Sequence, residues 1–350
     1  MTDPQSGRRS SRAWLYAPFV LLLVVALGWT AFWFVVRGRV MEAVDNALAR
    51  EEGLGRSWTC ADRSVTGFPF RVELRCSALA LASARWGEAV RVQTGPAVAV
   101  GQIYTPNLVI AQITGPLQAN LPEGRKLDLG WTRLEASLGH GTGGPERVSL
   151  VVTAPDAKLS APGLTPETWR AASVEAHLRR NPSRPAADQA IDLAIAAKGS
   201  VLPALDALLG TTEAGDVDIQ ATLTQSEAFR IGLNPDALEA WRTAGGQIEV
   251  TKLLSVKGPA RIEASGQFLI DQTHRPAGQI QASLAGIRQI AGIPVGGLAA
   301  GIGGLLGGRL SAQLPGAAPG LTALPLVVLR EGRVYLGPIR LPVQPLPALY

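Results

Sequence analysis

The hydrophobic and polar positions of this 350-residue chain follow two patterns, one near its start and another through most of the remainder. Residues 13–36 form an unbroken apolar run, and no charged residue stands between Arg12 and Arg37. At about 1.5 Å per residue, a helix of this length crosses a hydrocarbon core of about 30 Å. The run therefore predicts one transmembrane helix. Aromatic rings, which settle near lipid headgroups, stand toward both of its ends: Trp14, Tyr16, Trp29, Phe32, Trp33 and Phe34.

A cleavable signal peptide is the main alternative, because Ala26 and Gly28 offer small residues for a cleavage site. The apolar run continues beyond them through bulky rings to Val36, which favours an uncleaved signal-anchor.

The orientation of the span is harder to derive, because arginines flank it on both sides and the positive-inside count is nearly balanced. The N-terminal segment is short, and large downstream domains translocate largely regardless of charge. We therefore expect three regions: a cytoplasmic segment at 1–12, a transmembrane helix at 13–36, and a periplasmic or at least extracytoplasmic part at 37–350.

Beyond the span, apolar residues stand at every second position in one segment after another, which is typical of strands with one buried and one wet face. Strands of this kind belong to antiparallel sheets. We expect a mainly β fold with a curved antiparallel sheet, whose apolar face either is closed by a second sheet or lines an open groove. The apolar sets are Val72, Leu74 and Cys76; Val148, Leu150 and Val152; Val174, Ala176 and Leu178; Ile191, Leu193 and Ile195; Val217, Ile219, Ala221 and Leu223; Ile262, Ala264, Phe268 and Ile270; and Ile280, Ala282 and Leu284.

Only a few short helices are predicted. Residues 41–50 carry an apolar stripe, and either Gly53 or Gly55 is expected to stop this helix. Asn234 caps a second helix that begins at a proline and ends at two glycines. Two shorter helices are expected at 165–169 and 201–209.

A glycine-rich, uncharged segment covers residues 289–308. Its small residues could pack a second membrane helix, but each glycine weakens a helix by about 1 kcal/mol relative to alanine. A buried or loosely ordered helix outside the membrane is the favoured interpretation. A final strand is expected at 331–341, and a boundary within the periplasmic part is expected near 160–190.

Composition limits the function further. Charged residues make up 17% of the chain and the net charge is +5, carried by scattered arginines rather than by a basic block with interleaved aromatics. Nucleic-acid binding therefore has little support. Cys60 and Cys76 cannot form a four-ligand zinc site, and they lie in what reads as two strands around a turn. A disulfide between them is favoured, and two buried free thiols are the alternative.

No catalytic motif is present. The sequence lacks the serine-hydrolase, zinc-protease, phosphate-loop and dinucleotide patterns, and the three histidines, His140, His177 and His274, stand in unrelated contexts. We expect a protein that is not an enzyme and that uses no cofactor and no metal.

Two stretches carry a resemblance to a known family. The first runs from Cys60 to Cys76, and the second from Leu238 to Val250. With the N-terminal anchor, they resemble the proteobacterial domain of unknown function 2125 family, which implies an inner-membrane-anchored envelope protein and supplies no catalytic residues. A looser similarity is to AsmA-like proteins, associated with outer-membrane biogenesis and lipid movement. The most specific positions are Gly67, Phe68, Pro69, Phe70 and Arg71 in the first stretch and Trp241, Arg242, Gly245 and Gly246 in the second.

The expected function follows from the unpartnered apolar faces and the looser resemblance: an apolar β-groove that binds or handles lipid in envelope biogenesis. The alternative is a non-catalytic structural or protein-interaction module of the envelope. Partners would be the membrane, lipid and other envelope proteins. The groove candidates each alternate with polar neighbours, and they are Val217, Ile219, Leu223, Ile262, Phe268 and Ile280.

Overall fold

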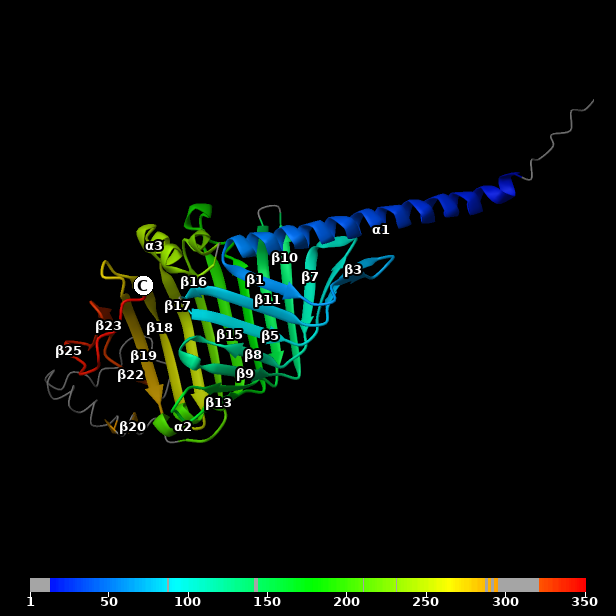
Figure 1. The fold of residues 1–350 in the computed structure, drawn as a ribbon. Coiled ribbons are helices and arrows are strands. Elements are labelled where there is room, and N and C mark those ends of the chain that lie inside the picture. Colours follow the sequence, from blue (N-terminus) through cyan, green and yellow to red (C-terminus); the bar gives the residue numbers. More distant parts are fainter. Residues whose placement is uncertain are drawn as a thin grey trace, which may run out of the picture.

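The computed structural model of the chain describes residues 13–86, 88–141, 144–209, 211–230, 232–286, 289–290, 293–294 and 321–350 (Figure 1). The fold is mainly β, as predicted, with two antiparallel sheets and one long N-terminal helix.

The long helix, α1 (Ala13–Gly53), contains both the predicted span and the helix expected at 41–50. The two are continuous because Gly38, the one weak helix former between them, costs only about 1 kcal/mol in a helix interior. The helix ends at Gly53, as predicted, and Gly55 follows in a left-handed conformation. Within the described residues, α1 is the one helix that is long and apolar enough to cross a membrane.

The larger of the two sheets, which we call the long sheet, has sixteen strands in the described part of the chain. Its strands are β2 (Ser64–Thr66), β3 (Arg71–Cys76), β6 (Ala97–Gln102), β7 (Thr105–Ile113), β10 (Arg133–Gly141), β11 (Gly144–Thr153), β14 (Ser173–Arg180), β15 (Ile191–Ser200), β16 (Gly215–Leu223), β17 (Ile248–Lys257), β18 (Ala260–Ile270), β19 (Pro276–Ala285), β22 (Thr322–Ala323), β23 (Val327–Arg330), β24 (Arg333–Leu336) and β25 (Ile339–Arg340). Except for β22, which pairs with β19, they lie side by side in chain order.

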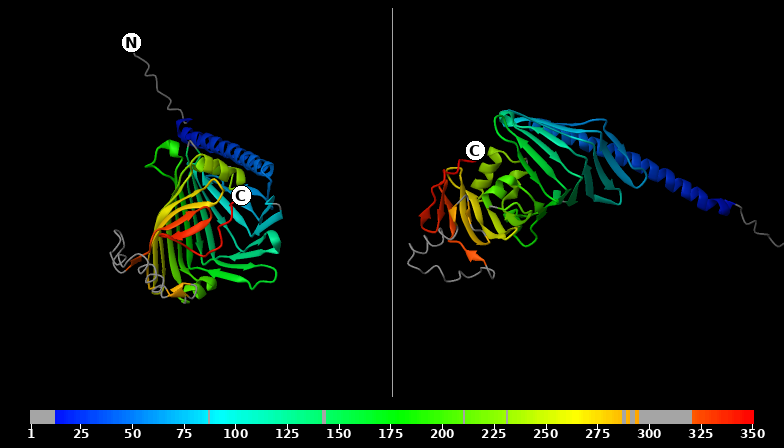
Figure 2. Two further views of the ribbon diagram at one scale, coloured as in Figure 1. Left: turned by 90° about the vertical axis from the view of Figure 1, so that its left-hand side faces the viewer. Right: turned by 90° about the horizontal axis from the view of Figure 1, so that it is seen from below.

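The other sheet, the short sheet, has seven strands among the described residues and lies across the long sheet at a large angle (Figures 1 and 2). Its strands are β1 (Arg56–Cys60), β4 (Leu79–Trp86), β5 (Glu88–Thr94), β8 (Leu117–Asn120), β9 (Lys126–Gly130), β12 (Asp156–Ser160) and β13 (Glu167–Arg170). A separate two-stranded pair joins β20 (Gln289–Ile290) to β21 (Ile293–Pro294).

Tight corners connect the two sheets. From β3 to β14 the chain alternates between two strands of one sheet and two of the other, so that each change of sheet takes only two or three residues. Backbone pairing continues through the corners, for example from the Thr114 amide to the Pro96 carbonyl at 2.8 Å. Corners of this kind join orthogonally packed sheets. From β14 onward the chain stays in the long sheet.

Every segment with period-two alternation is a strand in the structure, as predicted. The observed strands extend a few residues beyond the apolar sets. The expectations for residues 165–169 and 331–341 are wrong. Residues 165–169 fall partly in β13 rather than in a helix, because Glu167 to Arg170 pair with β12. The final strand expected at 331–341 is divided into β24 and β25 by the turn at Gly337, whose φ is +57°.

The glycine-rich segment has only four described residues, 289–290 and 293–294, and these are strands rather than helix. Residues 295–308, on which the remainder of that helix prediction falls, lie outside the described part of the chain.

Two predicted short helices are confirmed: α2 (Pro203–Leu209) and α3 (Pro235–Thr243). The Asn234 side chain accepts a hydrogen bond from the Ala237 amide at 2.9 Å, as the predicted cap requires. Three single turns of 3-10 helix complete the described elements: η1 (Pro122–Gly124), η2 (Ala186–Asp188) and η3 (Ser226–Phe229).

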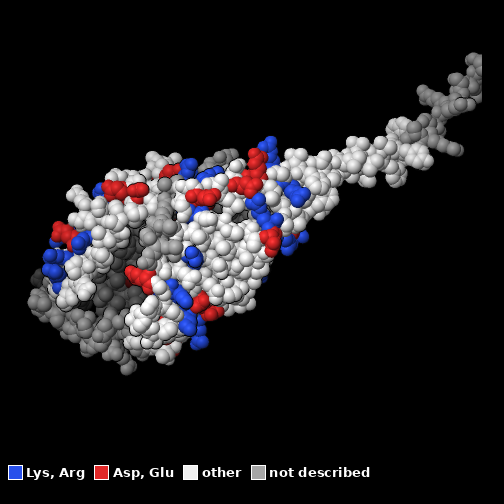
Figure 3. Space-filling model, viewed as in Figure 1, with Lys and Arg blue, Asp and Glu red and all other residues white. Residues whose placement is uncertain are grey.

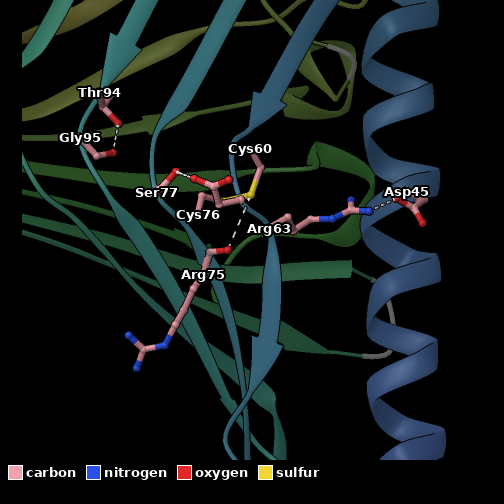
Figure 4. Close-up of a disulfide and its surroundings, with 9 residues drawn as sticks. Asp45, Cys60, Arg63, Arg75, Cys76, Ser77, Thr94 and Gly95 are labelled. Atoms are coloured by element: carbon pink, nitrogen blue, oxygen red, sulfur yellow. Dashed lines mark hydrogen bonds and ion pairs between the residues drawn. A yellow bond between two sulfur atoms is a disulfide. The ribbon is translucent and has the colours of Figure 1, made fainter.

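The predicted disulfide is present between Cys60 and Cys76, with 5.2 Å between the two Cα atoms (Figure 4). The expected hairpin is present, since β2 pairs with β3, but Cys60 lies outside it, in β1, which pairs with β4. The bond instead joins the short sheet to the long sheet at the first corner. Beside it, Arg63 makes an ion pair of 2.7 Å with Asp45, which attaches this corner to α1.

Candidate functional site

One face of the long sheet is apolar from end to end. Residues paired across neighbouring strands point to the same side of a sheet, so the register defines rows that cross the strands. We call the side that carries the following two rows the inner face. The first row is Leu74, Ala99, Ala111, Ala136, Leu150, Ala176, Ile195, Ile219, Leu253, Ala264 and Ala282. The second row is Val72, Gly101, Val109, Leu138, Val148, Leu178, Leu193, Ala221, Val250, Gly266, Ile280, Val327 and Leu336.

The structure brings the six predicted groove residues together on this inner face. Ile219 and Ile280 belong to the two rows, and the others lie on the same side of their strands. Leu223 and Phe268 flank Ile248 in one neighbouring row, while Val217 and Ile262 flank Ser255 in another.

The inner face is only partly buried: Val72, Val152, Leu284 and Leu336 are less than 10% exposed, but most of its residues are not buried. All six groove residues keep intermediate exposure, and Ile248 beside Phe268 is 36% exposed. No large side chain in the described residues falls below 2% exposure. Since the interior of a sandwich is close-packed, a face of this kind has room for additional apolar atoms.

The two sheets turn their apolar faces toward each other. Cys76 stands on the inner face and is bonded to Cys60, which lies in the short sheet. The short sheet crosses in front of the middle of the long sheet but ends before β18 and β19 (Figure 1). The sequence left two alternatives, an apolar face closed by a second sheet and an open groove. The structure combines them, because the short sheet faces the middle of the inner face, while the described elements place no second sheet over the part formed by β18 and β19.

The outer face of the long sheet is mixed and carries pairs of charged residues between apolar ones such as Val100, Ile110 and Leu254. Lys252 and Asp218 lie 2.5 Å apart on neighbouring strands, and Arg261 lies 2.6 Å from Glu263. On the same face, His177 contacts Glu175 at 3.4 Å. Because charged residues stand on one face and apolar rows on the other, the register of each strand is fixed.

Charged side chains meet the apolar face at its rims. At one rim, buried Lys257 at the end of β17 makes an ion pair of 2.7 Å with Asp206 of α2 and donates to the Glu213 carbonyl at 2.5 Å. At the opposite ends of β14 and β15, a cleft of about 700 Å³ is lined by the inner-face residues Val148, Leu178 and Ile191, by two glutamates, Glu146 and Glu227, and by five arginines, at positions 147, 179, 180, 184 and 230. Three of these arginines, at 179, 184 and 230, make ion pairs with carboxylates.

The first motif is the contact between the β domain and α1. The Trp29 indole donates to the Pro69 carbonyl at 2.8 Å, and the Trp33 indole donates to the Arg71 carbonyl at 3.0 Å. A Cβ at Gly67 would lie 2.8 Å from the same Arg71 oxygen, and φ there is +105°, so only glycine fits this turn. Sequence reasoning missed the pairing of the motif with α1, although the tryptophans and the motif were each recognised.

The second motif closes α3 onto the long sheet. Trp241 is 3% exposed and donates to the Thr224 carbonyl at 2.7 Å. Gly245 ends the helix in a left-handed conformation with φ +74°. A Cβ at Gly246 would lie 2.2 Å from the Trp241 indole nitrogen, so the ring occupies the space that any side chain would need.

Arg242 of the same motif anchors a cluster of polar side chains. Its guanidinium donates to both carboxylate oxygens of Glu239, at 2.8 and 2.6 Å, and the Tyr350 hydroxyl donates to Glu239 at 2.7 Å. The hydrogen bonds from Arg242 and Tyr350 lower the pKa of Glu239 to about 2. His274 stacks on Tyr350 at 4.6 Å. Every member of this cluster has a partner within it, so the cluster joins Tyr350 and His274 to α3.

The histidines stay apart from one another: His140 is in β10, His177 in β14, and His274 in the turn after β18. Among the described residues, no three His, Cys, Asp or Glu side chains gather as a metal site would require.

Residues 33–345 match a family described as an uncharacterized protein conserved in bacteria (DUF2125). The chain belongs to the DUF2125 family. The match includes both motifs, the inner face and the end of α1, so the resemblance carried by the motifs is confirmed over most of the chain. No curated protein and no solved structure matches the chain. For this DUF2125 protein, the apolar helix is consistent with a membrane anchor, and its inner face is the main candidate for function.

Proposed function

We propose that this DUF2125 protein is a non-catalytic component of the bacterial envelope that binds lipid acyl chains on the inner face of its long sheet. One observation carries the proposal: an apolar row crosses thirteen strands without a charged residue, and its large side chains from Val109 to Val327 are not buried. At about 4.8 Å between strands, this row extends for roughly 58 Å. Such a track suits a linear apolar ligand.

The energetics fit an acyl chain. Burial of apolar area stabilises a bound chain by about 25 cal/mol per Å², without any charged partner. Five arginines against two glutamates line the cleft at the rim, which adds a place where an anionic headgroup would meet an excess of positive charge while the chain reaches Val148 and Leu178. The looser resemblance to AsmA-like proteins supports the same role in envelope biogenesis.

The proposed location is the inner membrane, with α1 crossing once and the two sheets in the periplasm. The disulfide between Cys60 and Cys76 supports an oxidising compartment for the β domain. A reporter active only outside the cytoplasm, fused after Tyr350, is expected to be active. Activity of a cytoplasmic reporter alone would reverse the orientation.

Photocrosslinking tests the lipid-binding role directly. A photoreactive amino acid is placed at Ile219 or Phe268 on the inner face of the full-length protein in native membranes. Matched controls are the adjacent outer-face positions, Gln220 and Gln267. Lipid adducts are expected at the two inner positions and not at the two outer ones. Adducts to protein alone at the inner positions, or equal lipid labelling at all four, would leave a structural or protein-interaction module as the function.

A charged substitution on the inner face tests whether this face is an open groove or a packed interior. With an open groove, Ile219→Glu keeps a melting temperature near that of the unaltered protein and loses lipid that co-purifies, as measured by native mass spectrometry. In a packed sandwich the same carboxylate would be buried and the domain would unfold. Loss of folding together with loss of lipid would therefore count against the groove.

A further inference from the structure

The freely projecting part of α1 is too short to cross a bilayer. Residues 14–28 are exposed all round, whereas from Trp29 onward one side of the helix is covered. At about 1.5 Å per residue, 14–28 extend over roughly 22 Å, against a hydrocarbon core of about 30 Å. A span of about twenty residues therefore continues to about residue 33, into the part of α1 that contacts the β domain.

The turn between β2 and β3 is attached at this level of the helix. The two indole hydrogen bonds from Trp29 and Trp33 reach this turn, and Trp33 is 4% exposed. The Trp33 ring meets Phe68 edge-on at 5.5 Å. These contacts hold the turn against α1. The turn therefore lies at the same depth in the bilayer as Trp33.

The turn presents aromatic rings outward. Phe68 and Phe70 are 51% and 61% exposed, and Tyr104 in the neighbouring β6–β7 turn is 68% exposed. The Ile103 amide donates to the Phe70 carbonyl at 3.1 Å, which joins the two turns. Exposed rings of this kind are costly in water and favoured at membrane interfaces. The projecting helix carries no charge, and charged side chains begin where it meets the β domain (Figure 3).

We propose that the β2–β3 and β6–β7 turns rest in the interfacial layer of the bilayer that α1 crosses, with Phe68, Phe70 and Tyr104 inserted among the lipids. The partner is the lipid surface itself. Arg37 and Arg39, which follow the span on exposed positions of α1, then stand at the level of the lipid phosphates. This proposal depends on α1 being a membrane span and not on lipid binding by the inner face.

Spin labels test this arrangement in the full-length protein. Phe70→Cys and Tyr104→Cys are labelled separately, and Leu164→Cys is the control. Leu164 is 71% exposed and lies between β12 and β13, at the edge of the short sheet opposite β1, the strand that contacts α1. Since Cys60 and Cys76 are bonded to each other, only the new thiol reacts.

The labelled proteins are placed in nanodiscs of phosphatidylcholine and phosphatidylglycerol. Collision rates of each label with oxygen, which concentrates in lipid, and with a water-soluble nickel complex are then compared. The ratio of oxygen to nickel collisions is expected to be several-fold higher at positions 70 and 104 than at 164. Ratios at both positions equal to the control would overturn the proposal. Tyr104 lies in the β6–β7 turn, whereas both indole hydrogen bonds go to Pro69 and Arg71, so the second label gives a result even if Phe70→Cys loosens the first turn.

Discussion

The two family motifs build similar contacts in different surroundings. In each, a nearly buried tryptophan donates its indole N–H to a backbone carbonyl of another element: Trp33 to Arg71 at 3.0 Å and Trp241 to Thr224 at 2.7 Å. Around Trp241 the structure is closed, with Gly246 under the ring and Ala237 3% exposed. Around Trp33 the neighbouring rings stay open, since Phe34 and Phe68 are 55% and 51% exposed. The first contact therefore suits a lipid environment and the second an aqueous one.

The largest expected effect is at the closed contact. Trp241→Ala leaves a cavity between α3 and the long sheet and is expected to lower the free energy of unfolding by about 3–5 kcal/mol. Denaturant titration of the detergent-solubilised full chain measures it. Trp58→Ala is the control, since Trp58 is 40% exposed and is expected to cost much less. Equal losses for the two variants would show that the ring does not fill a packed site.

The next effect is at the corner beside the open contact. Cys76→Ser removes the bond between Cys60 and Cys76, which closes a short loop and is expected to contribute roughly 3 kcal/mol. Titration with and without reductant measures the change, and reductant is expected to have no effect on the variant. Alkylation of both thiols in unreduced, denatured protein would contradict the bond.

Substitutions that keep an aromatic ring isolate the hydrogen bonds. Trp33→Phe and Trp241→Phe each remove one donor and are expected to cost about 1 kcal/mol. Hydrogen exchange locates the effect. Trp33→Phe is expected to speed exchange of the Ile103 amide, which bonds to the first turn, and Trp241→Phe that of the Gly246 amide, which bonds to Trp241. Faster exchange at both sites in either variant would mean that the two contacts are not independent.

The smallest effect is a pH dependence confined to the second motif. Because the pKa of Glu239 is lowered to about 2, its bonds to Arg242 and Tyr350 stabilise the fold above the ordinary pKa of about 4.5 and are lost as the pH falls toward 2. Glu239→Gln is expected to lower the melting temperature at pH 7, and the difference should vanish near pH 2. The deficit of Trp33→Phe should stay constant over the same range. A constant deficit for Glu239→Gln would contradict the assigned interaction.

Local patterns predicted the strands well and their assembly poorly. Alternation places Val72, Leu74 and Cys76 on one face, and the structure agrees, because side-chain direction depends only on the period of the strand. The same alternation resumes at Leu79 and Leu81 after the corner, so it cannot indicate that the chain has changed sheets. The period identifies a face and does not identify the sheet.

The candidate site shows the same division. Six groove residues chosen by alternation share one face, while the tryptophan contacts of the first motif join residues 38 and 40 positions apart and had no local signal. At 165–169, a proline followed by an acid resembled a helix start, but pairing with β12 overrides that weak preference.

The meander of the long sheet from β14 onward has a consequence for how such a protein changes in evolution. Each strand there bonds mainly to the strands before and after it in the sequence, as the units of a repeat protein do. Insertion or loss of one hairpin would lengthen or shorten the sheet by about 10 Å and leave the corners and α1 untouched. Members of the family could therefore differ in the number of hairpins while keeping the same contact between the β strands and α1.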